Sequence, residues 1–288
     1  MLVITDGYTI YNEWEDISIH KAIKVNGLVM PDFLVRLCKA LNEGKEDKYN
    51  EIQKGITEDD IKALEIYYKD VAYHLSNIPR EKIDAVKMDN MISIGVEYLF
   101  NIVYGLKYND FSNVSDATNF WYANNTYEFP VIKDVLGSPV PMYGVTTLEL
   151  TEASDIDTVG RKNNHWEYTS LIIAYLCRPD GESLDIEKVK ERAEWFNNLP
   201  VSIAWSVYYR LYGAHEHIRK LYPKMFNKSK SKTPVMASEV DKMGWRSSVL
   251  NMAKNGYFNK AGLTSIESVE QSNFWDFLEV LNFERINK

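Results

Sequence analysis

The stretch Tyr175–Pro200, YLCRPDGESLDIEKVKERAEWFNNLP, places a cysteine, an arginine and an aspartate side by side between two apolar segments. Proline followed by Asp-Gly is typical of a tight turn, because proline fixes φ and Asp and Gly tolerate left-handed geometry. Beyond the turn, apolar residues recur at helical spacing, at Ile186, Val189, Ala193 and Phe196. The stretch therefore predicts a helix that ends before the turn and a second helix that begins near Ser183.

Cys177 is the candidate for chemistry in this stretch. A nucleophilic cysteine needs a base or a positive environment that stabilises its thiolate. No histidine is close to Cys177 in the sequence, although the fold could bring His165 or His215 to it. We interpret Cys177 as a core residue at a helix end. A site built from Cys177, His165, His215 and Glu216 remains the enzymatic alternative.

Apolar periodicity on both sides of the turn predicts a compact three-helix unit over residues 156–226. Its helices correspond to the segments 165–177, 183–199 and 200–222. Its expected core includes Leu171, Ile172, Trp195, Phe196, Ile203 and Val207. A linker rich in charge, serine and proline is expected over 227–235, followed by a C-terminal helix pair over 236–288.

The preceding residues, 1–155, are expected to form a mixed α+β domain. A hairpin is predicted around Asp6-Gly7, and alternation continues in WEDISIH, residues 14–20. Helices are predicted over 31–44, over 57–79 with a capping box of Thr57 and Asp60, and over 96–106.

Residues 120–152 differ in composition, with prolines, Asn-Asn and β-prone runs at 127–132 and 145–150, and indicate irregular strands and loop. The predicted fold is mainly α with a small β component, an N-terminal α/β segment being followed by a helical bundle and a C-terminal helix pair.

Composition narrows the classes of function. The chain has 33 basic and 41 acidic residues, a net charge of -8, which argues against a general nucleic-acid surface. No apolar run reaches about 18 residues and no basic leader precedes an apolar block, so neither a membrane span nor export is expected. Two cysteines without CxxC spacing indicate a reducing cytoplasm rather than a disulfide framework.

Sequence motifs for chemistry are missing. The chain contains no GxGxxG, GxxxxGK[ST], GxSxG or HExxH. His215 and His217 are two positions apart and diverge on a helix, whereas metal-binding pairs are spaced by three or four. The sequence therefore predicts no catalytic residue, no cofactor and no metal site.

Several segments together resemble a known family. They are WEDISI from Trp14, TEDDIKAL from Thr57 with Ile78-Pro79, LCRP, ERAEWFNNLPVSIAWSVYYRLYG, GWRSSVLNMAKNG, and SVEQSNFWDFLEVLNF. The pattern resembles tail assembly proteins of tailed bacteriophages, particularly those of Bacteroidetes-type hosts, and is most specific over Arg178–Tyr212. Many tail chaperones are shorter than this chain, and the aromatic insert Phe111–Gly144 is unfamiliar in them.

The resemblance implies a binding protein in the host cytoplasm that keeps the tape-measure protein soluble until the tail tube forms around it. The expected partner is the tape-measure or another tail protein, or further copies of the chain in a homo-oligomer, with no nucleic acid and no membrane. A structural subunit of the virion neck or tail is the alternative. The candidate contact residues are the C-terminal aromatics Trp245, Tyr257, Phe258, Phe274, Trp275 and Phe277.

Overall fold

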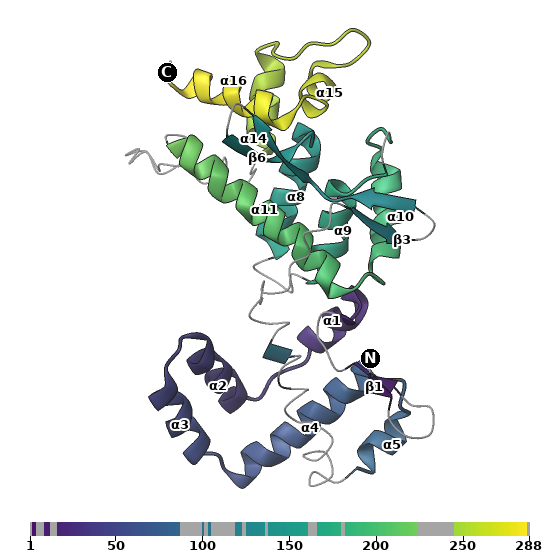
Figure 1. The fold of residues 1–288 in the computed structure, drawn as a ribbon, viewed down its shortest axis with the longest axis vertical. Coiled ribbons are helices and arrows are strands. Elements are labelled where there is room, and N and C mark those ends of the chain that lie inside the picture. The colour runs from purple at the N-terminus through teal and green to yellow at the C-terminus, as the bar shows by residue number, and fades with distance from the viewer. Residues whose placement is uncertain are drawn as a thin grey trace. The chain divides into compact units, whose positions relative to one another are not determined.

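The computed structural model describes residues 2–3, 9–11, 16–86, 100, 103–104, 119–122, 125–135, 138–160, 166–179, 182–223 and 245–286. These residues form a mainly α-helical structure with a small β component of two-stranded sheets, as the sequence predicts (Figure 1). The chain divides into two compact units. Unit 1 comprises Met1–Asn113 with Asn197–Ser202, and unit 2 comprises Val114–Phe196 with Ile203–Lys288.

Unit 1 contains a hairpin and a set of helices. Its described elements are β1 (Leu2–Val3), β2 (Thr9–Ile10), α1 (Ile19–Asn26), α2 (Asp32–Asn42), α3 (Glu46–Lys54), α4 (Glu58–Leu75) and α5 (Arg80–Asp84). The antiparallel pairing of β1 with β2 confirms the predicted hairpin, and α2 and α4 confirm two predicted helices. The helix predicted over 96–106 lies outside the described residues except at positions 100, 103 and 104.

Helix α1 corrects the prediction of continued strand-like alternation in WEDISIH. Extended backbone does occur just before the helix: Val201 N donates to Ile17 O at 2.8 Å, and Ile19 N donates to Leu199 O at 2.9 Å. Ser18 then caps the helix by accepting from Lys21 N. The alternation therefore belongs to a single short pairing between two chain segments, and not to a longer strand.

Helix α4 begins with the predicted capping box. Thr57 Oγ1 accepts from Asp60 N, and the Asp60 carboxylate accepts from Thr57 N at 3.0 Å. The Asp60 carboxylate accepts hydrogen bonds from both the backbone N–H and the hydroxyl of Thr57, and these two bonds lower the pKa of Asp60. The carboxylate's contribution to stability is therefore lost as pH falls through this lowered pKa. Gly44, at φ 65°, ends α2 in the left-handed conformation expected of a terminal glycine.

Unit 2 combines two hairpins with the remaining helices. Its described elements are β3 (Asn119–Tyr122), β4 (Asn125–Glu128), β5 (Val131–Val135), β6 (Ser138–Tyr143), α8 (Thr147–Gly160), α9 (Trp166–Leu176), α10 (Ile186–Phe196), α11 (Val201–Leu221, which begins in unit 1), α14 (Arg246–Lys254), α15 (Ser265–Glu270) and α16 (Phe274–Ile286). Helices α9, α10, α11, α14 and α16 match the predicted helical segments. The strand predicted over 127–132 is interrupted at Phe129–Pro130 between β4 and β5.

Helix α8 contradicts the prediction of strand and loop over 145–150. The contacts of α8 also explain why the two units differ from the predicted segments 1–155, 156–226, 227–235 and 236–288. Thr147 N donates to Ser272 O at 2.9 Å, and Phe274 N donates to Val145 O at 3.1 Å. These bonds join the C-terminal helices to α8, so both belong to unit 2. The predicted linker lies outside the described residues.

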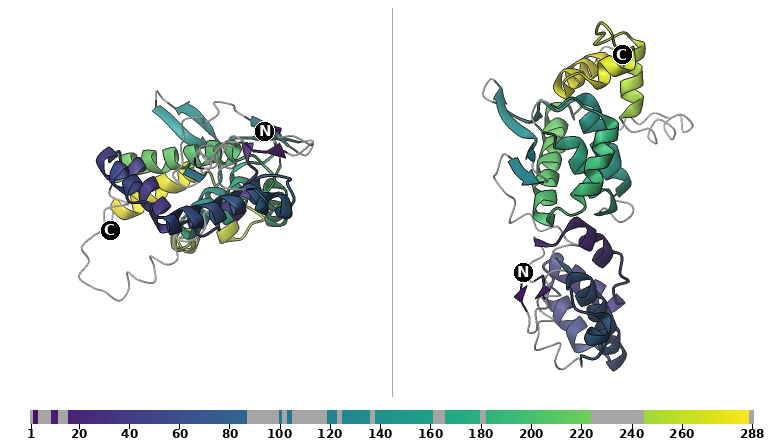
Figure 2. Two further views of the ribbon diagram at one scale, coloured as in Figure 1. Left: turned by 90° about the horizontal axis from the view of Figure 1, so that it is seen from below. Right: turned by 90° about the vertical axis from the view of Figure 1, so that its right-hand side faces the viewer.

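The core of unit 2 is rich in aromatic side chains between helices. Trp166 of α9 packs edge-on against Trp205 of α11, with ring centroids 5.1 Å apart, and both are buried. Helix α9 packs against both α8 and α10, and the views of Figures 1 and 2 show α11 running beside them. No helix among the described residues combines the length and apolar character that a membrane crossing requires.

The predicted core is correct for Ile172, Phe196 and Val207, which are fully buried. It is wrong for Trp195, whose exposed fraction is 42%. The buried face of α10 carries Val189, Arg192, Ala193 and Phe196, and Trp195 lies about 100° from Phe196 around the axis. Leu171 and Ile203 are half-buried.

Candidate functional site

The cysteine of the opening stretch lies in the core. Cys177 is completely buried at the end of α9, and its backbone N donates to Ile173 O at 2.8 Å. Burial raises the pKa of the Cys177 thiol, and the opposing effects of Arg210 and Arg192 are smaller. A thiol in this environment remains protonated at neutral pH and is a poor nucleophile.

We predict that Cys177 does not react with iodoacetamide at pH 7 in the folded protein, because the thiolate is disfavoured and the sulfur is inaccessible. Mass spectrometry after labelling should show modification of Cys177 only after unfolding in urea, which provides the positive control. Modification of Cys177 within minutes in the native protein would contradict this placement.

Of the histidines named in the enzymatic alternative, the structure describes His215 and places it against Ser154. The charged groups that influence Cys177 are Arg210, Arg192 and Glu149, whereas His215 Nε2 lies 2.9 Å from Ser154 Oγ on α8. The Ser154 hydroxyl donates to Leu150 O at 2.6 Å, so it serves as the acceptor for His215. This geometry fits a contact between helices and not an activated serine. His165 lies outside the described residues.

His215 and His217 contact different helices. His217 packs edge-on against Trp275 of α16, with centroids 5.7 Å apart, while His215 faces α8. Within the ranges that the structure describes, no three His, Cys, Asp or Glu side chains gather in a way that could hold a metal ion.

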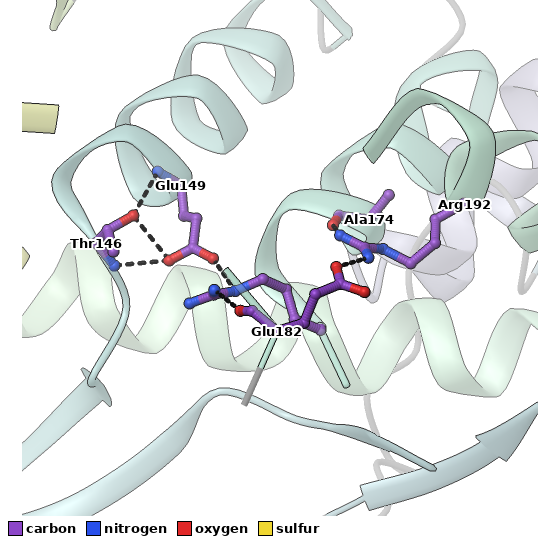
Figure 3. Close-up of polar contacts among 6 residues, drawn as sticks. Thr146, Glu149, Ala174, Glu182 and Arg192 are labelled. Carbon is purple, nitrogen blue, oxygen red and sulfur yellow. Dashed lines mark hydrogen bonds and ion pairs between the residues drawn. The ribbon is translucent and has the colours of Figure 1, made fainter. Parts of the chain in front are cut away.

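Arg178 and Glu149 form the first half of a charged cluster beneath the turn. Arg178 Nε lies 2.5 Å from Glu149 Oε1, and Glu149 is only 3% exposed. The other carboxylate oxygen of Glu149 accepts from Thr146 N at 2.7 Å and from Thr146 Oγ1 at 2.8 Å, while Thr146 Oγ1 accepts from Glu149 N (Figure 3). Glu149 therefore caps α8 and also neutralises the arginine that follows Cys177.

Arg192 and Glu182 form the second half. Figure 3 shows the Arg192 guanidinium between the Glu182 carboxylate and the carbonyl of Ala174, to which Nη2 donates at 3.3 Å. Arg178 in turn donates to the backbone carbonyl of Glu182. Arg192 is buried on α10, so a charged side chain ties α10 to the last turn of α9.

These contacts identify Tyr175–Pro200 as a structural joint. Two arginines and two glutamates neutralise each other in pairs, which is the condition under which charges persist in a low-dielectric interior. The joint also contacts the β-structure, because Glu128 N donates to Arg178 O at 3.4 Å and Tyr127 pairs with Pro179. The turn thereby fixes α8, α9, α10 and β4 to one another.

A cavity of about 450 Å³ opens beside the joint. Its wall includes Phe129, Pro130 and Pro179, and its polar groups include Arg178 and Ser183. A second cavity of about 280 Å³, near His215 and Ser154, is lined by Asp157, Thr158 and Trp245 as well.

The six predicted contact aromatics divide into two groups. Phe274 and Phe277 are buried in the core of unit 2 and pack with Trp245, whose ring centroid lies 5.7 Å from that of Phe274. Trp245, Tyr257, Phe258 and Trp275 are half-buried. Among the described residues of this region, the exposed aromatic area is therefore carried by the second group and by Phe283, which is 64% exposed and was not among the candidates.

Two other contacts that organise the region were not predicted, although the sequence carries a signal for them. Thr146 with Glu149 and Thr264 with Glu267 form the same capping arrangement as Thr57 with Asp60. Thr followed three residues later by Glu or Asp is the sequence signature of this cap. In contrast, the pairing of Arg192 with Glu182 depends on the turn between α9 and α10, and no spacing rule predicts it.

No protein-family model, curated protein or solved structure matches this chain.

Proposed function

We propose that this protein acts by binding another protein during the assembly of a phage tail, with the tape-measure protein as the client. The observation that carries the proposal is the apolar area on the C-terminal helices. Phe283 of α16 exposes 64% of its area, and Tyr257 and Phe258 in the loop after α14 are only half-buried. Exposed aromatic side chains of this kind are typical anchors of protein interfaces.

A hydrogen bond brings these side chains into one region. Tyr257 Oη donates to Glu284 Oε1 at 2.5 Å, so the loop that carries Phe258 lies beside the part of α16 that carries Phe283. We call Tyr257, Phe258 and Phe283 the aromatic patch.

Phe258 adopts a φ of 62°, in the left-handed region that is unfavourable for a bulky residue. Strain of this kind is often retained where a side chain has a function at the surface.

The phage context is supported by the resemblance of WEDISI, TEDDIKAL and the segment Arg178–Tyr212 to tail assembly proteins. The same resemblance supports an alternative role as a structural subunit of the virion. Mass spectrometry of purified particles distinguishes the two roles, because a chaperone leaves before maturation and a structural subunit remains in stoichiometric amounts.

Point substitutions test the aromatic patch better than a deletion of the C-terminal helices, because Phe274 and Phe277 belong to the core of unit 2. We predict that the double variant Phe258→Gly/Phe283→Ser folds normally, since glycine relieves the strain at φ 62° and Phe283 is mostly exposed. The yield of soluble tape-measure protein co-expressed with it should fall by about tenfold, as expected when interface anchors are removed.

Ile66→Ser is the matched control, because Ile66 of unit 1 is 63% exposed and its removal leaves the aromatic patch intact. A double variant that folds and keeps as much client soluble as the unaltered protein would refute the proposed contact.

A further inference from the structure

The cavity beside the joint presents a fixed arginine with unused hydrogen-bond donors. Arg178 directs Nε to Glu149 and Nη1 to the backbone carbonyl of Glu182. A guanidinium has five N–H groups, so these two bonds leave three available. Nη2 makes no hydrogen bond within the part of the chain that the structure describes, and Arg178 lines the cavity of about 450 Å³.

Two of the three acidic groups in the wall, Glu149 and Glu182, are already paired with arginines. Glu149 accepts from Arg178 and Thr146, and Glu182 accepts from Arg192. A ligand of the cavity therefore meets donors on Arg178 and the hydroxyl of Ser183, and not a pair of uncompensated carboxylates. This arrangement favours a ligand that carries a hydrogen-bond acceptor with negative charge.

The rest of the wall restricts the kind of anion. Phe129, Pro130 and Pro179 provide apolar surface, which suits an organic group attached to the anion. Glu128, also in the wall, is exposed and adds negative charge that opposes a doubly charged phosphate more than a singly charged carboxylate. Because Glu149 and the carbonyl of Glu182 hold the guanidinium in place, binding requires little further ordering of this side chain.

We propose that this cavity binds a carboxylate attached to an apolar group, such as the C-terminal residue of a peptide, through the Nη2 edge of Arg178. The site is separate from the aromatic patch and does not depend on the proposed role in tail assembly.

The probe is N-acetyl-L-phenylalanine, with N-acetyl-L-phenylalanine amide as the matched neutral ligand, titrated into the full chain and followed by the NMR signal of the Arg178 Nε–H group. This signal is assigned by its loss in Arg178→Lys. We expect the acid to shift the signal with a dissociation constant in the millimolar range, and the amide to bind at least about tenfold more weakly, since it lacks the charge. Equal shifts from acid and amide would overturn the proposal. So would the absence of a shift from either ligand at roughly 20 mM.

Ser183→Trp tests the location, because it fills the cavity and leaves Arg178, Glu149 and Glu182 unchanged. It should weaken binding of the acid by at least about tenfold, while Ser265→Trp, at an exposed serine outside the cavity wall, should not. An unchanged affinity in Ser183→Trp would contradict the site.

Two further ligands define the class. 3-Phenylpropionate lacks the peptide group but keeps the carboxylate and the apolar ring, so it should also shift the Arg178 Nε–H signal, and the absence of a shift would contradict recognition of an apolar carboxylate. Binding of inorganic phosphate as tight as that of the acid would overturn the assignment to a carboxylate.

Discussion

Replacing Phe196 with alanine is expected to lower the free energy of unfolding by about 3–5 kcal/mol, the range found for a fully buried phenylalanine. Phe196 is completely buried at the end of α10, and its ring contacts Phe120 and Tyr127 of the β3–β4 hairpin at centroid distances of 5.9 and 5.0 Å. Alanine would leave a cavity between α10 and the hairpin. Urea denaturation followed by circular dichroism measures the change.

Trp195→Ala is the matched control for this prediction, because Trp195 is the adjacent residue and is larger, yet 42% of its area is exposed. Its replacement should cost less than about half as much as that of Phe196. A loss below about 1 kcal/mol for Phe196→Ala, or a larger loss for Trp195→Ala, would contradict the packing of α10.

Arg178→Met is expected to cost about 3–5 kcal/mol, the range for removing one partner of a buried ion pair. Glu149 is 3% exposed, and without Arg178 its charge would remain in the interior, where the donors left to it among the described residues are the N–H and hydroxyl of Thr146. Adding Glu149→Gln should recover most of the loss, because glutamine can still accept from Thr146 and carries no charge. The same urea denaturation measures both variants.

An exposed ion pair provides the control. Arg219 and Glu216 are 2.8 Å apart on the surface of α11, so Arg219→Met should change stability by less than about 1 kcal/mol. If Arg178→Met/Glu149→Gln is no more stable than Arg178→Met, the cost does not come from a stranded charge at Glu149, and the proposed energetics of the joint are wrong.

Local signals in the sequence predict many of the helices and strands, and they predict that the joint at Tyr175–Pro200 is structural. The apolar period of α10 and α11 and the cap at Thr57 are properties of neighbouring residues, and each predicts its structure correctly. Asp180 and Gly181 of the predicted turn lie outside the described residues. Burial of Cys177 also follows from its place at the end of an apolar helix.

Long-range contacts account for what the sequence did not predict. Val145 and the threonines that follow it suggest a strand, but the packing of α8 against α9 and the bond from Thr147 N to Ser272 O stabilise a helix from Thr147 onward. The charged cluster joins Glu149, Arg178 and Arg192 from three different segments, which no spacing in the sequence identifies. Burial of Phe274 and Phe277 likewise depends on contacts with Trp245, so the exposed part of the C-terminal region could not be read from composition.

Hydrogen–deuterium exchange of the full chain, alone and in complex with the tape-measure protein from the same genome, tests the proposed binding function most directly. The account predicts that binding slows exchange in the loop at residues 255–258 and at the C-terminal end of α16, where the aromatic patch lies. Failure to form a complex, or a complex in which these two segments exchange as fast as in the free protein, would contradict it.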